Sequence, residues 1–325
     1  MTLSRRAALA LPLLAAPRLA LAAEFPDRPI RFICPYAPGG NADVTSRILS
    51  APLAAELGQP VVVENRAGAG GSVGALAAAR LRPDGYSVML GSNGPLSVNP
   101  TIQPNIGYDP QKDFSFIGLC CRTPQTIVVK KGLAPKTLAE FMDYARARPG
   151  QVTVGSSGVG STAHLALETF NAMTGLQLQH VPYGSGGAMA PDLVAGNIDA
   201  GITEISTSLP LHRDTQVRIL ALAAARRSAL APDIPTAEEA GVPGYREAAF
   251  LGLVLPANPP AEIVARWHLA LSRVLALPET QRRLQEVGSV VAEPAEQSPD
   301  GFGAFLAAEL ARTRTAATRA GLRQG

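Results

Sequence analysis

The chain has 325 residues, of which 46% are hydrophobic and 17% charged, with 29 basic and 26 acidic side chains. This length and composition exclude a disordered chain and indicate a globular protein of two domains, each large enough to bury a core. The small positive excess comes without clusters of Lys and Arg interleaved with aromatic residues, so we expect no nucleic-acid partner.

The first residues have the pattern of an export signal. Two arginines at 5–6 precede an uncharged Ala/Leu-rich run at 7–16, and residues 20–22 have the small-x-small pattern read by signal peptidase. The run is shorter than the about 20 residues that a membrane span needs. We expect a periplasmic protein, exported by the general or the twin-arginine route and cleaved near Ala22 or Ala23. Loss of three leader arginines would leave 26 basic and 26 acidic residues.

Short β-rich runs alternate with helical patterns along most of the chain. This rhythm predicts an α/β fold of parallel sheets with helices on both faces. From about Pro260 onward three helical patterns follow one another, and Trp267 lies on the apolar stripe of the first, as a core residue would. The expected strands cover 30–35, 61–63, 87–90, 126–129, 151–154 and 178–181, and the expected helices cover 42–57 with an interruption at Pro52, 73–81, 138–148 and 161–173.

The three cysteines, Cys34, Cys120 and Cys121, lack the spacing of a zinc site or of a disulfide scaffold. We expect buried thiols, and a disulfide among them stays open because periplasmic proteins form such bonds. The histidines and carboxylates show no metal-ligand spacing, so neither a metal nor another cofactor is expected.

Two glycine-rich turns follow predicted strands and begin predicted helices, one in each half of the chain. They are residues 35–43 and 155–162. Glycines let backbone N–H groups face outward and a helix start adds partial positive charge, so both turns suit an anion. Asp43 either caps its helix or meets a donor on the ligand. The second turn lacks the lysine of a phosphate-binding loop, since Ser161 stands there, and no acid follows for a ribose.

A third turn, residues 68–74, supplies an enzymatic alternative. Gly70, Ser72 and Gly74 match the nucleophile elbow of a serine hydrolase. An elbow places its serine directly after a strand, whereas residues 64–69 intervene here. We therefore favour a binding protein without catalytic residues over a secreted hydrolase that uses Ser72.

A series of short motifs carries a family resemblance over nearly the whole mature chain. Taken in order, the chain resembles the substrate-binding receptors of tripartite tricarboxylate transporters, the Bug-type proteins. The motifs are Arg28-Pro29-Ile30-Arg31, Pro38-Gly39-Gly40 with Asp43, Gly58 to Arg66, Pro83-Asp84-Gly85-Tyr86, Tyr108-Asp109-Pro110, His180-Val181-Pro182-Tyr183, Pro235-Thr236 and Glu238 to Gly241.

The resemblance implies a monomeric periplasmic receptor with two α/β lobes, which closes by a hinge on a small carboxylate. Integral membrane transporter subunits would receive the ligand, and a sensory co-receptor role is a further alternative. Lobe 1 would comprise residues 24–120 and 246–325, and lobe 2 residues 121–245. Two strands near 116–122 and 250–255 would cross between them.

The resemblance also implies ligand contacts, largely through backbone N–H groups. For Tyr183, scaffold packing is the alternative. The implied contacts in lobe 1 are Ala37, Gly39, Gly40, Asp43, Ser92 and Asn93, and those in lobe 2 are Ser156, Ser157, Gly160, Ser161, Thr162 and Tyr183.

Three positions depart from the family pattern. Gly184 stands in place of a lysine, Cys34 in place of a valine, and Thr203 in place of an acid, with Glu204 directly after it. The second-lobe changes alter the far end of the pocket, where such receptors distinguish ligands. We therefore count Thr203 and Glu204 among the contacts and leave the carboxylate unnamed.

Overall fold

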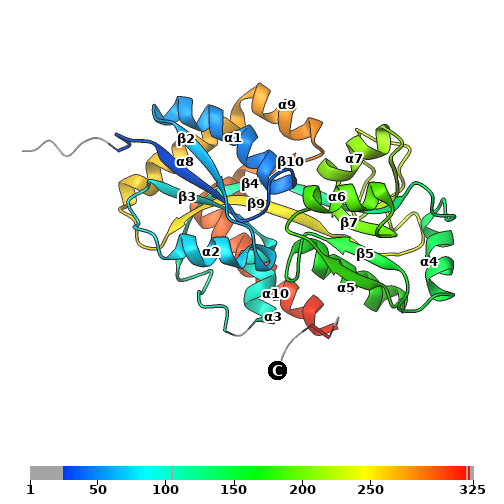
Figure 1. Cartoon of the computed structure of the whole chain (residues 1–325). Coiled ribbons are helices and arrows are strands. Elements are labelled where there is room, and N and C mark those ends of the chain that lie inside the picture. Colours follow the sequence, from blue (N-terminus) through cyan, green and yellow to red (C-terminus); the bar gives the residue numbers. More distant parts are fainter. Residues whose placement is uncertain (1–24, 104, 320, 323–325) are drawn as a thin grey trace, which may run out of the picture.

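The computed structural model describes residues 25–103, 105–319 and 321–322, so the expected export signal lies outside the described residues. The chain folds into two lobes, which lie side by side in Figure 1. Lobe 1 begins with β1 (Ile30–Cys34), α1 (Asn41–Leu57), β2 (Val61–Asn65), η1 (Ala69–Gly71), α2 (Ser72–Ala79), β3 (Ser87–Ser92), η2 (Gly94–Val98) and α3 (Asn99–Ile102).

The long strand β4 (Phe114–Lys130) leads into lobe 2, and β9 (Ala248–Pro256) returns to lobe 1. Lobe 2 contains α4 (Leu138–Arg146), β5 (Thr153–Ser156), α5 (Thr162–Thr174), β6 (Gln179–Pro182), α6 (Gly186–Ala195), β7 (Ala200–Glu204), α7 (Ile205–Arg213) and β8 (Val217–Leu222). The chain ends with α8 (Ala261–Ala276), α9 (Pro278–Glu286), β10 (Val290–Val291), η3 (Pro294–Gln297) and α10 (Pro299–Arg319).

One sheet runs through both lobes in the order β2-β1-β3-β9-β4-β7-β5-β6, with β8 and β10 also paired to β4. In lobe 1, β1 is parallel to β2 and β3; in lobe 2, β5 is parallel to β6 and β7. β4 pairs antiparallel with β9 as far as Pro124 and with β7 from Gln125 onward. The backbone N–H of Gln125 donates to the carbonyl of Glu247, which fixes the two crossing segments to each other.

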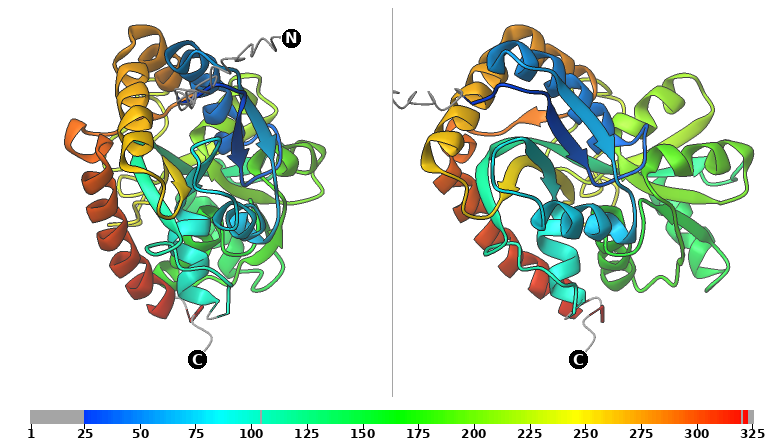
Figure 2. Two further views of the ribbon diagram at one scale, coloured as in Figure 1. Left: turned by 90° about the vertical axis from the view of Figure 1, so that its left-hand side faces the viewer. Right: turned by 60° about the vertical axis from the view of Figure 1, so that its left-hand side comes forward.

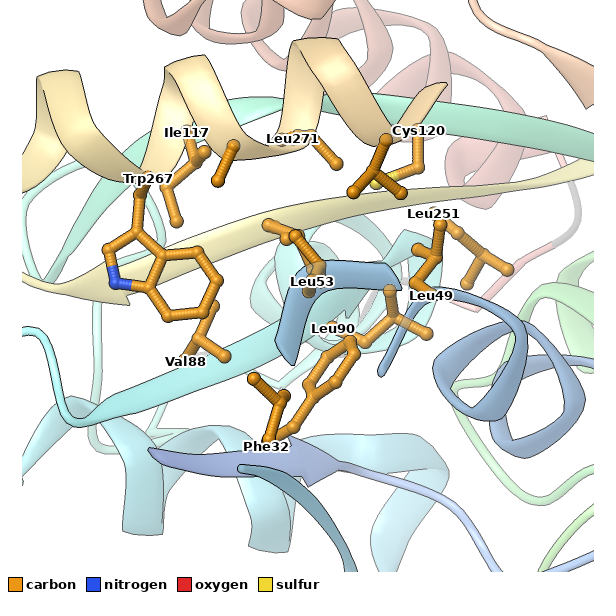
Figure 3. Packing of buried hydrophobic residues seen from close by; sticks show 14 of the residues in the cluster. Phe32, Leu49, Leu53, Val88, Leu90, Ile117, Cys120, Leu251, Trp267 and Leu271 are labelled. Carbon is orange, nitrogen blue, oxygen red and sulfur yellow. The ribbon is translucent and has the colours of Figure 1, made fainter. Parts of the chain in front are cut away.

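The lobe 1 core lies on both faces of its sheet. On one face α1 and α8 pack against the strands, and Figure 3 shows Trp267 and Leu271 of α8 pointing toward residues of β1 and β3. Trp267 is fully buried and donates its indole N–H to the carbonyl of Gly85, so the expected core role is confirmed. On the other face α2 and α10 pack around Phe302.

Lobe 2 has the same arrangement, with α4 and α5 on one face and α6 and α7 on the other. The C-terminal helix α10 reaches this lobe, as Figure 2 shows. Ala317 of α10 packs with Leu165 of α5 and with Val98 of lobe 1. The predicted helical C-terminal cap therefore contacts both lobes.

Several elements differ from the sequence predictions. Helix α1 continues through Pro52, because Leu49, Leu53 and Leu57 on one face are buried and hold both parts in the core. The strand expected at 126–129 is the end of the much longer β4. Helices α6 and α7 were not predicted, since their short patterns contain Gly, Ser and Pro residues, and strand β8 was not predicted either.

The three cysteines are buried and form no disulfide, as expected for buried thiols. Burial raises the pKa of Cys34 to about 11 and that of Cys121 to about 12. None of the helices in the described part of the chain combines the length and the apolarity needed to cross a membrane.

Candidate ligand-binding cleft

A cavity lies between the two lobes, with about 350 Å³ of space not filled by protein atoms when the open solvent at its mouth is included. Both lobes and the crossing strand β9 contribute to its wall. None of the lining residues is Lys, Arg or His. The lining consists of Tyr36, Gly40, Asn41, Ala42, Ser92, Ser157, Thr162, Ser185, Gly186, Glu204, Ala249 and Leu251.

Four helices begin at this cavity. They are α1 at Asn41, α5 at Thr162, α6 at Gly186 and α7 directly after Glu204. The first N–H groups of a helix have no acceptor within it, and the helix dipole places about half a positive charge there. The cavity therefore offers positive potential and N–H donors without a cationic side chain.

In the lobe 1 turn, Asp43 organises the backbone and does not line the cavity. Its carboxylate accepts hydrogen bonds from the N–H of Gly39 at 3.0 Å, from Asn65 at 2.9 Å and from Arg47 at 3.1 Å. Burial alone would raise the pKa of Asp43, but these hydrogen bonds and the Arg47 charge lower it below the usual value. Of the two open roles, the structure favours a hydrogen-bonding role at the start of α1 over a contact with the ligand.

The same turn touches lobe 2 directly. The N–H of Ala37 donates to the carbonyl of Gly184 at 3.2 Å, and Ser185 donates to the carbonyl of Pro38 at 3.4 Å. A Cβ on Gly187 would lie 2.5 Å from the carbonyl carbon of Gly39. The expected contacts Ala37 and Gly39 thus lie at a close contact between the lobes, while Gly40 lines the cavity.

In the lobe 2 turn, three expected contacts bond within the scaffold. The Ser156 hydroxyl lies 2.6 Å from Nε2 of His180 and accepts from the N–H of Gly158. Ser161 caps α5 by accepting from the N–H of His164, and the N–H of Gly160 donates to Nδ1 of His164. None of Ser156, Gly160 and Ser161 lines the cavity.

Two stacked histidines form hydrogen bonds with the lobe 2 turn. The rings of His164 and His180 lie 4.3 Å apart. Burial, together with the nearby His180, lowers the pKa of His164 to about 4, and burial lowers the pKa of His180. The His164 ring is therefore neutral near pH 7, as the Gly160 hydrogen bond to its Nδ1 requires.

The remaining lobe 2 predictions divide between the cavity and its surroundings. Ser157, Thr162 and Glu204 line the cavity. Thr203 does not line it; its hydroxyl lies 3.4 Å from a carboxylate oxygen of Glu204. Tyr183 bonds to Asp192 at 2.7 Å and lines a neighbouring cavity of about 480 Å³.

Glu204 is the acidic group of the cavity wall. It is 7% exposed, and its carboxylate accepts from the side-chain amide of Gln125 at 3.1 Å. Burial raises the pKa of Glu204, and the hydrogen bonds from Gln125 and Thr203 oppose this. Of the two departures from the family pattern in this segment, Glu204 thus lines the cavity, and Thr203 lies next to its carboxylate.

At the end of β3, Ser92 and Asn93 point to different places. Ser92 lines the cavity, and its hydroxyl lies 3.2 Å from that of Tyr36. Asn93 accepts from the N–H of Phe250 at 2.8 Å and donates to Glu309, so it links β3 to β9 and α10. Asn93 therefore connects structural elements and does not line the cavity.

The third glycine-rich turn forms a contact between the lobes. A Cβ on Gly70 would lie 2.3 Å from the carbonyl oxygen of Val159. Ser72 begins α2 after the helical turn η1, and its hydroxyl has no hydrogen-bond partner among the described residues. The geometry that the hydrolase alternative requires is therefore not met, as the intervening residues in the sequence had indicated, because six residues separate Ser72 from the end of β2.

Sequence reasoning missed several wall residues. Tyr36, Asn41 and Ala42 belong to the first turn, which the sequence had identified without assigning them contacts. Ser185 and Gly186 belong to a fourth glycine-rich turn, 184–187, which has the same strand-to-helix signal as the others. Ala249 and Leu251 lie on β9, and no sequence signal showed which of its faces meets the cavity.

The comparisons with known proteins agree with this geometry. The family model described as "Tripartite tricarboxylate transporter family receptor" matches residues 45–322. Protein BugT of Bordetella pertussis is 32% identical over 89% of this chain and 88% of its own.

Two solved structures are also similar. MatC from Rhodopseudomonas palustris with bound malate is 32% identical, with a TM-score of 0.86 over 90% of this chain and 99% of its own. R. palustris Rpa4515 with adipate is 32% identical, with a TM-score of 0.87 over 92% of this chain and 99% of its own. This chain belongs to the receptor family of the tripartite tricarboxylate transporters, a family of periplasmic solute-binding proteins.

Proposed function

We propose that this protein captures a small organic acid in the cavity between its lobes and delivers it to the membrane subunits of a tripartite transporter. The observation that carries the proposal is the meeting of four helix N-termini at one cavity between the lobes. Such helix ends stabilise a carboxylate through oriented N–H donors and partial positive charge.

An unpartnered donor in the wall supports the same conclusion. The side-chain nitrogen of Asn41 is buried and has no hydrogen-bond partner among the described residues. Its residue lines the cavity at the start of α1. Leaving a buried polar group unpaired costs about 1–3 kcal/mol, so a ligand oxygen that accepts from Asn41 would recover this energy.

Binding would couple to closure of the lobes about the crossing strands. Strands β4 and β9 connect the lobes, so bending near residues 123–125 and 247–249 would open the cavity. Closure replaces water around the carboxylate with fixed N–H donors. Each such charge-assisted bond contributes about 1.5–3 kcal/mol, and three or four suffice for micromolar affinity after ordering costs.

The solved relatives support an organic acid as the ligand, because MatC was solved with bound malate and Rpa4515 with adipate. We further propose a monomer in the periplasm, with the leader removed near Ala22 or Ala23. Residues 24–120 and 246–325 would move as lobe 1 and residues 121–245 as lobe 2. Ser72 is not placed for hydrolysis, so we propose binding without catalysis.

A thermal-shift screen of refolded protein tests the proposal. Each acid is compared with its amide, for example succinate with succinamide, so that only the carboxylates differ. An acid at 100 times its Kd should stabilise the protein by about 2.7 kcal/mol, a shift of several degrees, whereas its amide should not. The acid should be recovered chemically unchanged. Stabilisation by no acid, or equal stabilisation by acid and amide, would contradict the proposal.

A further inference from the structure

Glu204 differs from the other buried acids in the described part of the chain. Four acidic side chains are buried there: Asp43, Glu204, Glu247 and Glu309. Asp43 pairs with Arg47 at 3.0 Å, and Arg312 pairs with both Glu309 at 2.7 Å and Glu247 at 3.4 Å. Within the described residues, Glu204 has no basic partner.

The side chains that form hydrogen bonds with Glu204 in the described part of the chain are neutral. Gln125 donates to one carboxylate oxygen, the Thr203 hydroxyl lies near the other, and Tyr36 lines the same cavity. The side-chain oxygen of Gln125 is itself buried without a donor among the described residues. The two side chains that contact the Glu204 carboxylate therefore bring no positive charge to it.

An ionised acid in a closed cavity needs an opposite charge, because desolvation without pairing costs several kcal/mol. The helix N-termini offset part of the charge, but they are also needed by the ligand carboxylate. A ligand with a second ionised carboxylate beside Glu204 would add like-charge repulsion at low dielectric. A ligand that brings a cation removes both costs.

We propose that the ligand is a zwitterionic acid, whose carboxylate binds at the helix N-termini and whose cationic nitrogen pairs with Glu204. This inference rests on the proposed function and narrows its ligand class to amino-substituted acids. It makes Glu204 the residue that determines specificity for the second functional group. The simple dicarboxylates would then be poorer ligands for this chain.

Titration calorimetry on refolded protein at pH 7 tests the inference with ligands on one carbon frame. The four-carbon series is 4-aminobutanoate, 4-hydroxybutanoate, butanoate and succinate, and aspartate, malate and succinate form a second series. We expect the ammonium compound to bind at least tenfold more tightly than its methyl, hydrogen or carboxylate counterpart. The hydroxyl compounds should be intermediate. If another acid is the best ligand in the thermal-shift screen, it is compared with its own amino derivative in the same way.

Variants assign the preference to this residue. Glu204→Gln keeps the shape and the Gln125 hydrogen bond but removes the charge, so it should abolish the tenfold preference. Glu204→Asp should retain part of it, which distinguishes loss of charge from misfolding. Glu262→Gln, at an exposed position on α8, makes the same charge change away from the cavity and should leave the preference intact.

The outcomes separate this inference from the proposed function. Tightest binding by succinate, especially if it strengthens as the pH falls, would mean that protonated Glu204 donates to a second carboxylate, and the inference would be wrong. A preference for the ammonium compound that survives in Glu204→Gln would also overturn it. In both cases acid binding itself would stand, whereas binding of no acid would remove the proposed function.

Discussion

The two glycine-rich turns look alike in sequence, yet the structure uses them differently. In lobe 1, helix α1 has Gly40 as its N-cap and no side-chain cap, so its first N–H groups remain available at the cavity. In lobe 2, Ser161 caps α5 and His164 accepts from Gly160. In the lobe 1 turn the N–H groups of Ala37 and Gly39 are occupied, but the first N–H groups of α1 remain available to a ligand. The lobe 2 turn contributes hydroxyl groups from Ser157 and Thr162.

This difference teaches that a glycine-rich turn is not by itself a set of ligand contacts. Capping serines and a neutral histidine can occupy its donors, while glycines serve the close approach of two lobes. Gly70 and Gly187 illustrate the second role, because a methyl group on either would collide with the opposite lobe.

The largest expected effect on ligand affinity comes from blocking the close approach of the two lobes. We expect Gly187→Ala to weaken acid binding by about 100-fold, or about 2.7 kcal/mol, because its Cβ would press on Gly39 and prevent closure. Stability without ligand should be retained, since Ala favours a helix over Gly. Calorimetry measures the affinity, and Gly132→Ala, whose Cβ would meet nothing within 4 Å, is the control. Unchanged affinity would show that binding does not need this contact.

The second effect concerns pH and should arise from the lobe 2 turn. The folded state holds His164 neutral with a pKa of about 4, whereas the unfolded chain takes up a proton near 6.5. Between these values the unfolded state binds more protons, so stability falls as the pH falls. The loss between pH 7 and pH 5 should be about 2 kcal/mol.

Denaturant unfolding at the two pH values measures this loss. The charged and titratable groups facing His164 are His180, stacked on its ring, and Glu168, 3.8 Å from Nε2. His164→Asn should remove most of the difference, and His268→Asn on α8 should preserve it. An equal loss in the His164 variant would assign the pH effect to other groups.

A third test concerns the open donors of lobe 1. Asn41→Ala should weaken acid binding about tenfold, because the ligand loses a charge-assisted hydrogen bond. Stability without ligand should change little, since the buried amide nitrogen has no partner and the Asn41 oxygen loses one hydrogen bond, from Ser206. Ser206→Ala removes only the Ser206 hydrogen bond to the Asn41 oxygen across the lobes, so it separates that contact from ligand binding. Equal affinity losses in both variants would show that Asn41 makes no direct contact with the ligand.

The smallest expected effects distinguish neighbouring serines of the lobe 2 turn. Ser161→Ala should lower the free energy of unfolding by about 1 kcal/mol through loss of the helix cap. Ser157→Ala should leave stability nearly unchanged and weaken acid binding by about 1 kcal/mol. Thermal unfolding and calorimetry on both variants provide the comparison. The reverse pattern would mean that the two serines exchange roles when the ligand binds.

The sequence by itself determined the α/β alternation, the buried Trp267 and the strand-to-helix turns. Hydrophobic periodicity and glycine placement are local signals, and residues close in sequence carry them. Family motifs added the two lobes and the crossing strands. The expected cavity residues Gly40, Ser92, Ser157, Thr162 and Glu204 were therefore within reach of sequence reasoning.

Only the tertiary structure decided which polar groups remain available to a ligand. Asp43, Asn93, Ser156 and Ser161 have the right chemistry, but partners brought by the fold occupy their hydrogen-bonding groups. The unpaired charge of Glu204 is likewise visible only when every neighbour is known. A side chain's type is local information, whereas its hydrogen-bonding balance depends on residues far away in the chain.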